Sequence, residues 1–191
     1  MGRFSDYAKT LHERTIAAQA TDRNGSAVEI ENAVVAMGEQ MRAAHRRGNK
    51  LMFVGNGGSA GICSHMAIDY SKNGGMRATA FNDGAALTCL GNDLGFEQVF
   101  ATQIDLHARP EDVLIAISSS GRSKNILNAV AVARQRNCVV FTLSGFDATN
   151  DLRGLGDMNI YVASGEYGIV EIAHAWILHA VLDLEMGLDK K

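Results

Sequence analysis

Two stretches with helical character carry acidic and imidazole side chains at spacings that can support chemistry. His65 and Asp69 are four residues apart, so on a helix they share one face and lie about 6 Å apart along its axis. Such a pair can bind a metal or move a proton, but it also occurs as a plain contact on a helix surface. The pair comes shortly after a glycine-rich turn, and this position favours a functional role.

The second stretch, GIVEIAHAWILHAVLDLEM, is apolar around Glu171, His174 and His179. A carboxylate buried alone is costly, so Glu171 requires a partner, a metal or water. His174 diverges from His179 by about 140° around the helix and is interpreted as a core residue. Glu171 and His179 differ by about 80° and are about 12 Å apart along the axis, so one metal reaches both only with extended side chains or with help from another chain. That distance is a hint of a site completed across a subunit interface.

A glycine-rich turn, GNGGS at residues 55–59, follows the apolar run 51–54. Glycine permits positive φ and a close approach of the backbone to a ligand, and amides at the start of the next helix attract anions. The turn is neither a Walker A sequence nor a full GxGxxG pattern, which disfavours nucleotide binding. A tight turn without a ligand is the alternative interpretation.

A serine-rich turn, SSSGRS at residues 118–123, follows another apolar run and precedes an expected helix. One serine is enough to cap a helix, and this turn has four. Serine hydroxyls and exposed amides form a neutral cradle for a phosphate group, so we expect phosphate binding here. Asn92 and Asp93, in LGNDLGFEQVF, fit either an Asx turn or helix cap or an acceptor for polyol hydroxyls, and spacing alone does not choose between these.

These side chains require a scaffold, and from residue 50 onward short apolar strands alternate with helices. The alternation predicts an α/β fold, a three-layer doubly wound sandwich around a mainly parallel five-stranded sheet. Ligands then bind at the carboxyl ends of the strands, where both turns are expected. The expected strands are 50–54, 77–81, 112–117, 138–143 and 158–163; the expected helices are 3–21 and 27–47 before the sheet, then 58–72, 84–91, 96–106, 122–136 and 168–186.

The bulk properties indicate one ordinary α/β domain. A length of 191 residues suits a single domain spanning 1–191, with a helical pair at 1–48 and an α/β core at 49–191. The net charge of −3 argues against a general binder of nucleic acid or membrane surfaces. Three widely separated cysteines and no apolar run of membrane-spanning length indicate reduced thiols and a cytoplasmic location.

In combination, GNGGSA, GNDLGFEQVF, ISSSGRSKNIL and the histidine-bearing last helix resemble the sugar isomerase (SIS) domain family over nearly the whole chain. The likeness is greatest to the phosphoheptose isomerases, which convert sedoheptulose 7-phosphate to D-glycero-D-manno-heptose 7-phosphate. The resemblance implies the SIS fold, an aldose–ketose isomerase acting through an enediol, one zinc ion per subunit, and a homotetramer assembled through the two N-terminal helices. Neither nucleic acid nor membrane is an expected partner.

The resemblance also implies roles for individual residues. Zinc would be bound by His65, Asp69, Glu171 and His179, with Asp69 as the catalytic base, Glu171 as its substitute and His179 as the acid or shuttle. The chain departs from the family pattern because Asp69 replaces a glutamate and Glu171 replaces a glutamine. The substrate-binding residues would be Asn56, Gly57, Gly58, Ser59, Asn92, Asp93, Ser118, Ser119, Ser120 and Ser123.

Three other functions remain open. The chain can isomerise another ketose phosphate, and the replacements at Asp69 and Glu171 encourage that reading. It can also be a non-catalytic SIS protein that binds a replication-initiator partner, or a sensor of a phosphosugar. Retention of both histidines and both acidic groups favours catalysis over binding alone.

Overall fold

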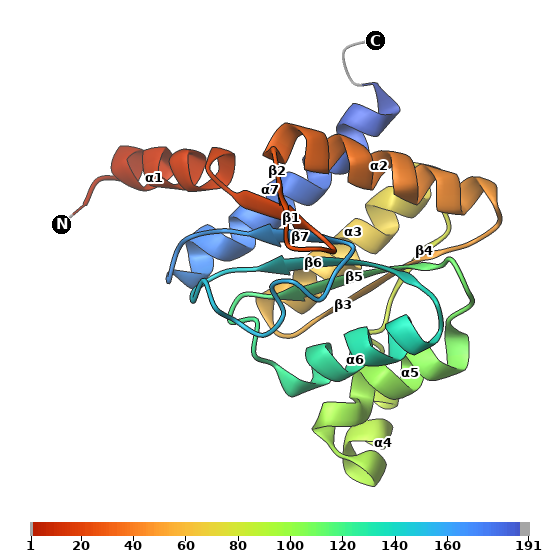
Figure 1. The fold of residues 1–191 in the computed structure, drawn as a ribbon. Coiled ribbons are helices and arrows are strands. Elements are labelled where there is room, and N and C mark those ends of the chain that lie inside the picture. Colours follow the sequence, from red (N-terminus) through yellow and green to blue (C-terminus); the bar gives the residue numbers. More distant parts are fainter. Residues whose placement is uncertain (1, 188–191) are drawn as a thin grey trace.

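The computed structural model describes residues 2–187 and shows three layers, with helices on both faces of a central sheet (Figure 1). The sheet has seven strands in the order β2-β1-β7-β6-β5-β3-β4. The strands are β1 (Gln19–Asp22), β2 (Ala27–Val28), β3 (Leu51–Gly55), β4 (Ala78–Ala80), β5 (Val113–Ser118), β6 (Val139–Ser144) and β7 (Met158–Tyr161). The helices are α1 (Phe4–Ile16), α2 (Ile30–Arg46), α3 (Gly58–Lys72), α4 (Gly84–Leu94), η1 (Phe96–Gln98), α5 (Val99–His107), α6 (Lys124–Gln135) and α7 (Tyr167–Met186).

The five predicted strands form the parallel part of the sheet, β3 to β7. The central strands β3 and β5 are continuous apolar runs because both of their faces are covered. In β3, Leu51 and Phe53 pack into the core under α2, α3 and α7, whereas Met52 and Val54 pack into the core over α5 and α6. This alternation is the two-residue period of a strand. Because β3 and β5 pair in parallel, their carboxyl ends lie at the same edge of the sheet.

The sheet has seven strands, two more than predicted. The helix expected over 3–21 ends earlier, at Ile16. The chain leaves α1 after Ile16 and forms β1, which pairs antiparallel with β7 and with the short strand β2. Four residues of mixed polarity (QATD) carry too little pattern to predict a strand. The strand forms because the open edge of β7 supplies partners for its backbone groups.

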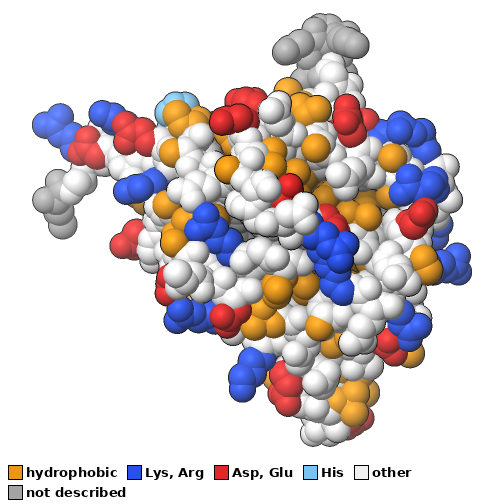
Figure 2. Space-filling view, viewed as in Figure 1, with side chains coloured by type: hydrophobic (Ala, Val, Ile, Leu, Met, Phe, Trp, Pro, Cys, Tyr) orange, Lys and Arg blue, Asp and Glu red, His pale blue; other side chains and the backbone are white. Residues whose placement is uncertain are grey.

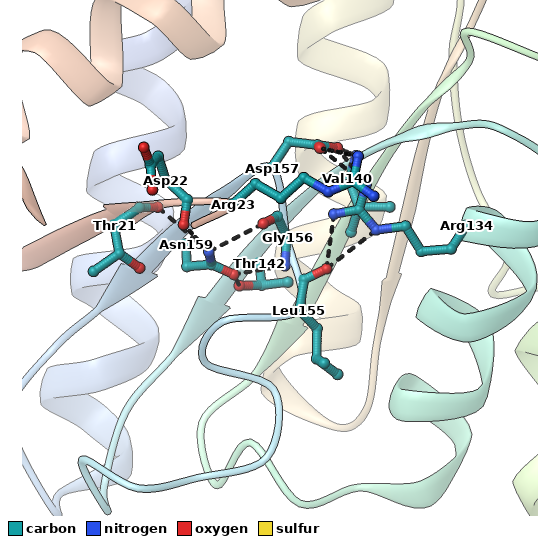
Figure 3. Close-up of polar contacts among 10 residues, drawn as sticks. All are labelled: Thr21, Asp22, Arg23, Arg134, Val140, Thr142, Leu155, Gly156, Asp157 and Asn159. Carbon is teal, nitrogen blue, oxygen red and sulfur yellow. Dashed lines mark hydrogen bonds and ion pairs between the residues drawn. The ribbon is translucent and has the colours of Figure 1, made fainter. Parts of the chain in front are cut away.

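A buried polar cluster ties this edge to the sheet (Figure 3). The side chain of Asn159 in β7 accepts hydrogen bonds from Thr142 and from the backbone of Gly156, and donates to the carbonyl oxygen of Thr21 in β1. Beside it, Asp157 accepts two hydrogen bonds from the guanidinium of Arg134, at 2.9 and 2.8 Å. Since these partners satisfy the buried groups, we interpret the cluster as structural.

Two helices stand out from the body of the molecule, α1 on one side and α4 on another (Figure 1). Charges of both signs are interspersed over the face shown in Figure 2, with apolar side chains between them. No helix within residues 2–187 has the length and apolar character needed to cross a bilayer.

Candidate functional site

The glycine-rich and serine-rich turns line one pocket of about 260 Å³ at the carboxyl ends of β3 and β5. This arrangement is the one expected for a ligand site in a parallel sheet. The lining residues are Asn56, Gly57, Gly58, Ser59, Ile117, Ser118, Ser119, Ser120, Ser123, Tyr167 and Glu171. The structure therefore brings together eight of the ten residues predicted to bind substrate, and it adds Glu171.

A pair of amides holds the two turns together. The side chains of Asn56 and Asn125 exchange two hydrogen bonds, both 2.9 Å long, so the glycine-rich turn is fastened to the first turn of α6. Asn125 is buried, and its position in SSSGRSKN did not mark it as part of the site. The pair fixes the separation of the two turns before a ligand arrives, which lowers the entropic cost of binding.

Glycine is required where α3 begins. Gly57 has a φ of +54°, which side chains rarely adopt. A Cβ atom at Gly58 would collide with the carboxylate of Glu171, which lies directly over the glycine backbone. The position of the Glu171 carboxylate over the turn thus depends on the absence of a side chain at residue 58.

The hydroxyl groups of the serine-rich turn are arranged as a neutral cradle. The hydroxyl of Ser118 contacts that of Ser123 at 3.3 Å, and the buried hydroxyl of Ser119 has no hydrogen-bond partner within residues 2–187. A buried polar atom without a partner is costly, so an incoming acceptor would relieve that cost. The charge of Arg122 is offset by Asp147, whose carboxylate accepts a hydrogen bond from its guanidinium at 2.6 Å on the surface.

A second group of functional side chains lies where α3 and α7 pack together. The Nε2 atom of His65 is 3.2 Å from the Nε2 atom of His179 and 3.4 Å from a carboxylate oxygen of Asp69. The Nδ1 atom of His179 is 3.8 Å from the same oxygen. The three residues, one exposed and two half-buried, form the metal-competent triad His65, Asp69 and His179.

The donor set of the triad fits zinc. Zinc is bound by imidazole nitrogen and carboxylate oxygen at about 2 Å, which leaves ligand atoms about 3–4 Å from one another. The three donor atoms of the triad all lie within 4.8 Å of one another. The expected fourth ligand, Glu171, is not part of this cluster within the described residues, because its carboxylate is over Gly58 in the pocket.

The triad and the pocket occupy successive levels along the contact between α3 and α7. The first level is formed by Gly58 of α3 and Glu171 of α7. The second level is formed by His65, seven residues further along α3, and His179, eight residues further along α7. At 1.5 Å per residue the two levels are about 10–12 Å apart. A ligand that contacts both must therefore be elongated, with its anionic group at the serine-rich turn.

His174 is a core residue, as the sequence indicated. It is fully buried, and burial lowers the pKa of its imidazole to about 4, although a contact with the backbone of Ser144 opposes that shift. Its Nε2 atom is 3.1 Å from the carbonyl oxygen of Ser144, to which the neutral ring donates. The residue therefore supports the fold and is not a ligand for the triad.

Asn92 and Asp93, predicted to contact substrate, do not lie at the pocket of their own chain. Both side chains are exposed in the last turn of α4, and the amide of Asn92 donates to the carboxylate of Asp93 at 2.7 Å. Neither residue lines the pocket, because α4 projects away from the sheet (Figure 1). Conversely, Tyr167 at the start of α7 does line the pocket, and no sequence pattern singled it out.

Comparison with known proteins identifies relatives that cover most of the chain. The SIS domain family matches residues 16–145. A phosphoheptose isomerase of Pelobacter propionicus is 38% identical over 154 residues, covering 78% of this chain and 81% of the relative. A phosphoheptose isomerase of Geobacter metallireducens is 36% identical over 169 residues, covering 85% and 89%. The solved structure of the phosphoheptose isomerase GmhA from Neisseria gonorrhoeae superposes with a TM-score of 0.82 at 28% identity, covering 95% of this chain and 94% of that one.

Proposed function

The chain belongs to the SIS domain family, and we propose that it is an aldose–ketose isomerase that converts sedoheptulose 7-phosphate to D-glycero-D-manno-heptose 7-phosphate. The observation that carries the proposal is the meeting of the two turns in one pocket, where the buried hydroxyl of Ser119 awaits an acceptor. Relatives that match over most of the chain are phosphoheptose isomerases, and they share this reaction.

An elongated phosphosugar suits the two levels of the site. The phosphate of a seven-carbon sugar would rest on the serine-rich turn, held by neutral donors. Its carbon chain would pass Glu171, and the carbonyl end would reach the triad. Binding energy from the phosphate, remote from the reacting carbons, then orients C1 and C2 beside the acid and base groups.

The reaction moves one proton between neighbouring carbons. Asp69 takes a proton from C1 of the ketose while His179 protonates the carbonyl oxygen at C2, which gives an enediol. The proton then returns to C2, and the hydroxyl at C1 gives up its proton as the aldehyde forms. Glu171 is the alternative base, and its carboxylate is positioned to accept hydrogen bonds from sugar hydroxyls in the pocket.

We propose zinc as the metal of the triad, with one ligand atom each from His65, Asp69 and His179. The second carboxylate oxygen of Asp69 and the second ring nitrogen of His179 are then left for the proton transfers. When bound beside the carbonyl, zinc supplies polarisation and stabilises negative charge on oxygen. Glu171, predicted as a fourth ligand, is assigned to the sugar pocket instead. Zinc dependence is tested by dialysis against a chelator, followed by measurement of turnover on adding back one ion per chain.

We further propose a cytoplasmic homotetramer built from one SIS domain per chain. An apolar groove of about 150 Å³ lies between α1, α2 and α7, and large side chains beside it are exposed, among them Ile16, Trp176 and Leu184. Apolar surface of this kind is typical of a buried contact between copies. Asn92 and Asp93 would then reach a substrate only across a subunit contact. Free cysteines agree with a reducing compartment.

The deciding experiment is incubation of the purified protein with sedoheptulose 7-phosphate and zinc in heavy water. We expect aldose phosphate to form with deuterium at C2, because the proton held by the base exchanges with solvent. Fructose 6-phosphate serves as the comparison for another ketose phosphate. No aldose and no exchange with either sugar would favour the non-catalytic alternatives.

A further inference from the structure

The amino ends of the parallel strands carry a second polar pocket, of about 390 Å³, that the isomerase reaction does not use. Its wall comes from the residues that lead into β3, β4 and β5, so it lies at the opposite edge of the sheet from the sugar pocket. A strand of six residues separates the two edges by about 20 Å. The lining residues that matter here are Lys50, Arg77, Phe81, His107, Arg109 and Asp112.

The pocket is positive in a chain whose net charge is −3. Three cationic side chains face one carboxylate, that of Asp112, which is almost fully buried. Lys50 is committed to that carboxylate and to the carbonyl oxygen of His107. The carboxylate of Asp112 thereby offsets the charge of Lys50. The remaining positive charge of the pocket comes from Arg77 and Arg109.

Both arginines retain donors for a ligand. Arg77 gives one guanidinium N–H to the carbonyl oxygen of Gly48 and keeps the others. The guanidinium of Arg109 makes no hydrogen bond or ion pair with any of residues 2–187, although its backbone N–H is fixed by Asp112 at 2.8 Å. Planar guanidinium groups match the oxygens of a phosphate better than any other side chain. In the view of Figure 2, Lys and Arg side chains also gather near the C-terminal end of α2, from which the chain enters this pocket.

One wall of the pocket is aromatic. The rings of Phe81 and His107 are stacked, with centroids 5.9 Å apart and an angle of 16° between their planes. Such a surface suits the organic part of a ligand, and the volume of the pocket is that of sites for small molecules. Inorganic phosphate alone would leave this wall uncovered.

From these features we propose that the pocket at the amino ends of β3, β4 and β5 is a second anion site, which binds a small phosphate monoester through Arg77 and Arg109. The ester group lies against Phe81 and His107. The site is independent of the proposed isomerase function, because it shares no residue with the sugar pocket.

Equilibrium dialysis with radiolabelled phenyl phosphate tests the proposal on the full chain. The expected result is two sites per chain, of which Ser119→Ala weakens one and Arg77→Gln combined with Arg109→Gln weakens the other by about tenfold or more. Arg109→Gln alone gives a smaller loss at the same site, and its unpaired side chain makes it safe for folding. Inorganic phosphate should bind the second site at least about tenfold more weakly, since it cannot use the aromatic wall.

The matched control is Lys9→Gln combined with Arg14→Gln, which removes the same charge from α1. It should leave both sites intact. If only one site per chain is found, and Ser119→Ala weakens it while both arginine variants leave it unchanged, the second site is refuted. The proposed isomerase function is not affected by that result. An equal loss in the control pair would show nonspecific attraction and overturn it as well, and equal binding of inorganic phosphate would overturn the assignment of an ester.

Discussion

The two edges of the parallel sheet each carry a proposed anion site, and the two sites use different kinds of donor. At the carboxyl edge the pocket is lined by hydroxyls, glycine backbone and one carboxylate, Glu171. At the amino edge the pocket is lined by Lys50, Arg77 and Arg109. Neutral donors select by geometry, whereas cations also attract from a distance and are screened by salt.

The difference has a chemical reason. A cation in the sugar pocket would form an ion pair with Glu171, the carboxylate that lines it. Neutral hydroxyls hold a phosphate without that competition, so Glu171 is left to accept hydrogen bonds from sugar hydroxyls. At the amino edge the carboxylate of Asp112 is already paired with Lys50, so arginine carries no such disadvantage.

The largest predicted effect is a loss of turnover when a proposed acid or base group at the carboxyl edge is removed. Asp69→Asn removes the proposed base, and we expect turnover of sedoheptulose 7-phosphate to fall about 10²–10⁴-fold while the sugar phosphate still binds. His179→Ala should behave in the same way. Asp105→Asn, which alters an exposed carboxylate on α5, is the control and should keep its turnover. Near-normal rates in both triad variants would refute these roles.

The next effect concerns the stability of the amino edge. Asp112 accepts hydrogen bonds from Lys50, Arg109 and Asn49, which lower the pKa of its carboxyl despite the opposing effect of burial. Asp112→Asn should therefore destabilise the protein by about 2–3 kcal/mol in urea unfolding. Asp105→Asn breaks only an exposed ion pair and should cost about 0.5 kcal/mol or less. Equal losses for the two variants would contradict the comparison.

The two edges should also lose stability in different pH ranges. Burial gives His174 a pKa of about 4 in the folded protein, against 6.5 for a histidine exposed in the unfolded chain. Between pH 6.5 and pH 4 the unfolded chain therefore binds a proton that the folded protein does not, and stability falls as the pH falls. For Asp112 the lowered pKa means that its contribution is complete above about pH 4 and is lost only below it.

From pH 7 to pH 5, His174 alone should remove about 2 kcal/mol of unfolding free energy. Urea unfolding at both pH values, in the wild type and in His174→Gln, measures this as a difference between the two proteins. An identical pH dependence in both would mean that the imidazole is not held neutral by burial.

The smallest effect tests the neutral cradle. Ser119→Ala removes a buried hydroxyl that has no partner within the described residues, so unfolding free energy should change by less than about 0.5 kcal/mol or increase. The KM for sedoheptulose 7-phosphate should nevertheless rise about tenfold, since one donor to the phosphate is lost. Ser26→Ala, on the exposed turn between β1 and β2, is the control. An unchanged KM would remove Ser119 from the phosphate site.

Sequence patterns predicted the parts of the molecule that depend on local chemistry. The strands β3, β5 and β6 were placed nearly correctly because each is a mainly apolar run that ends in glycine or serine. The serine-rich turn and the spacing of His65 and Asp69 were recognised for the same reason. The shorter strands β4 and β7 include Thr79 and Asn159, and both were predicted too long. The pattern failed at residues 19–22, where pairing with β7 decides the conformation. For Asn92 the pattern left the role open, and the residue does not line the pocket of its own chain.

The sequence by itself therefore determined which side chains can bind phosphate, carry protons or hold a metal, because side-chain chemistry and turn conformation are local properties. Only the tertiary structure decided which of them meet. Packing of α7 on α3 joins His179 to His65 and Asp69 but sends Glu171 to the glycine-rich turn. Likewise Lys50, Arg77 and Arg109 are about thirty residues apart in the chain, and they share a pocket because parallel strands begin at one common edge.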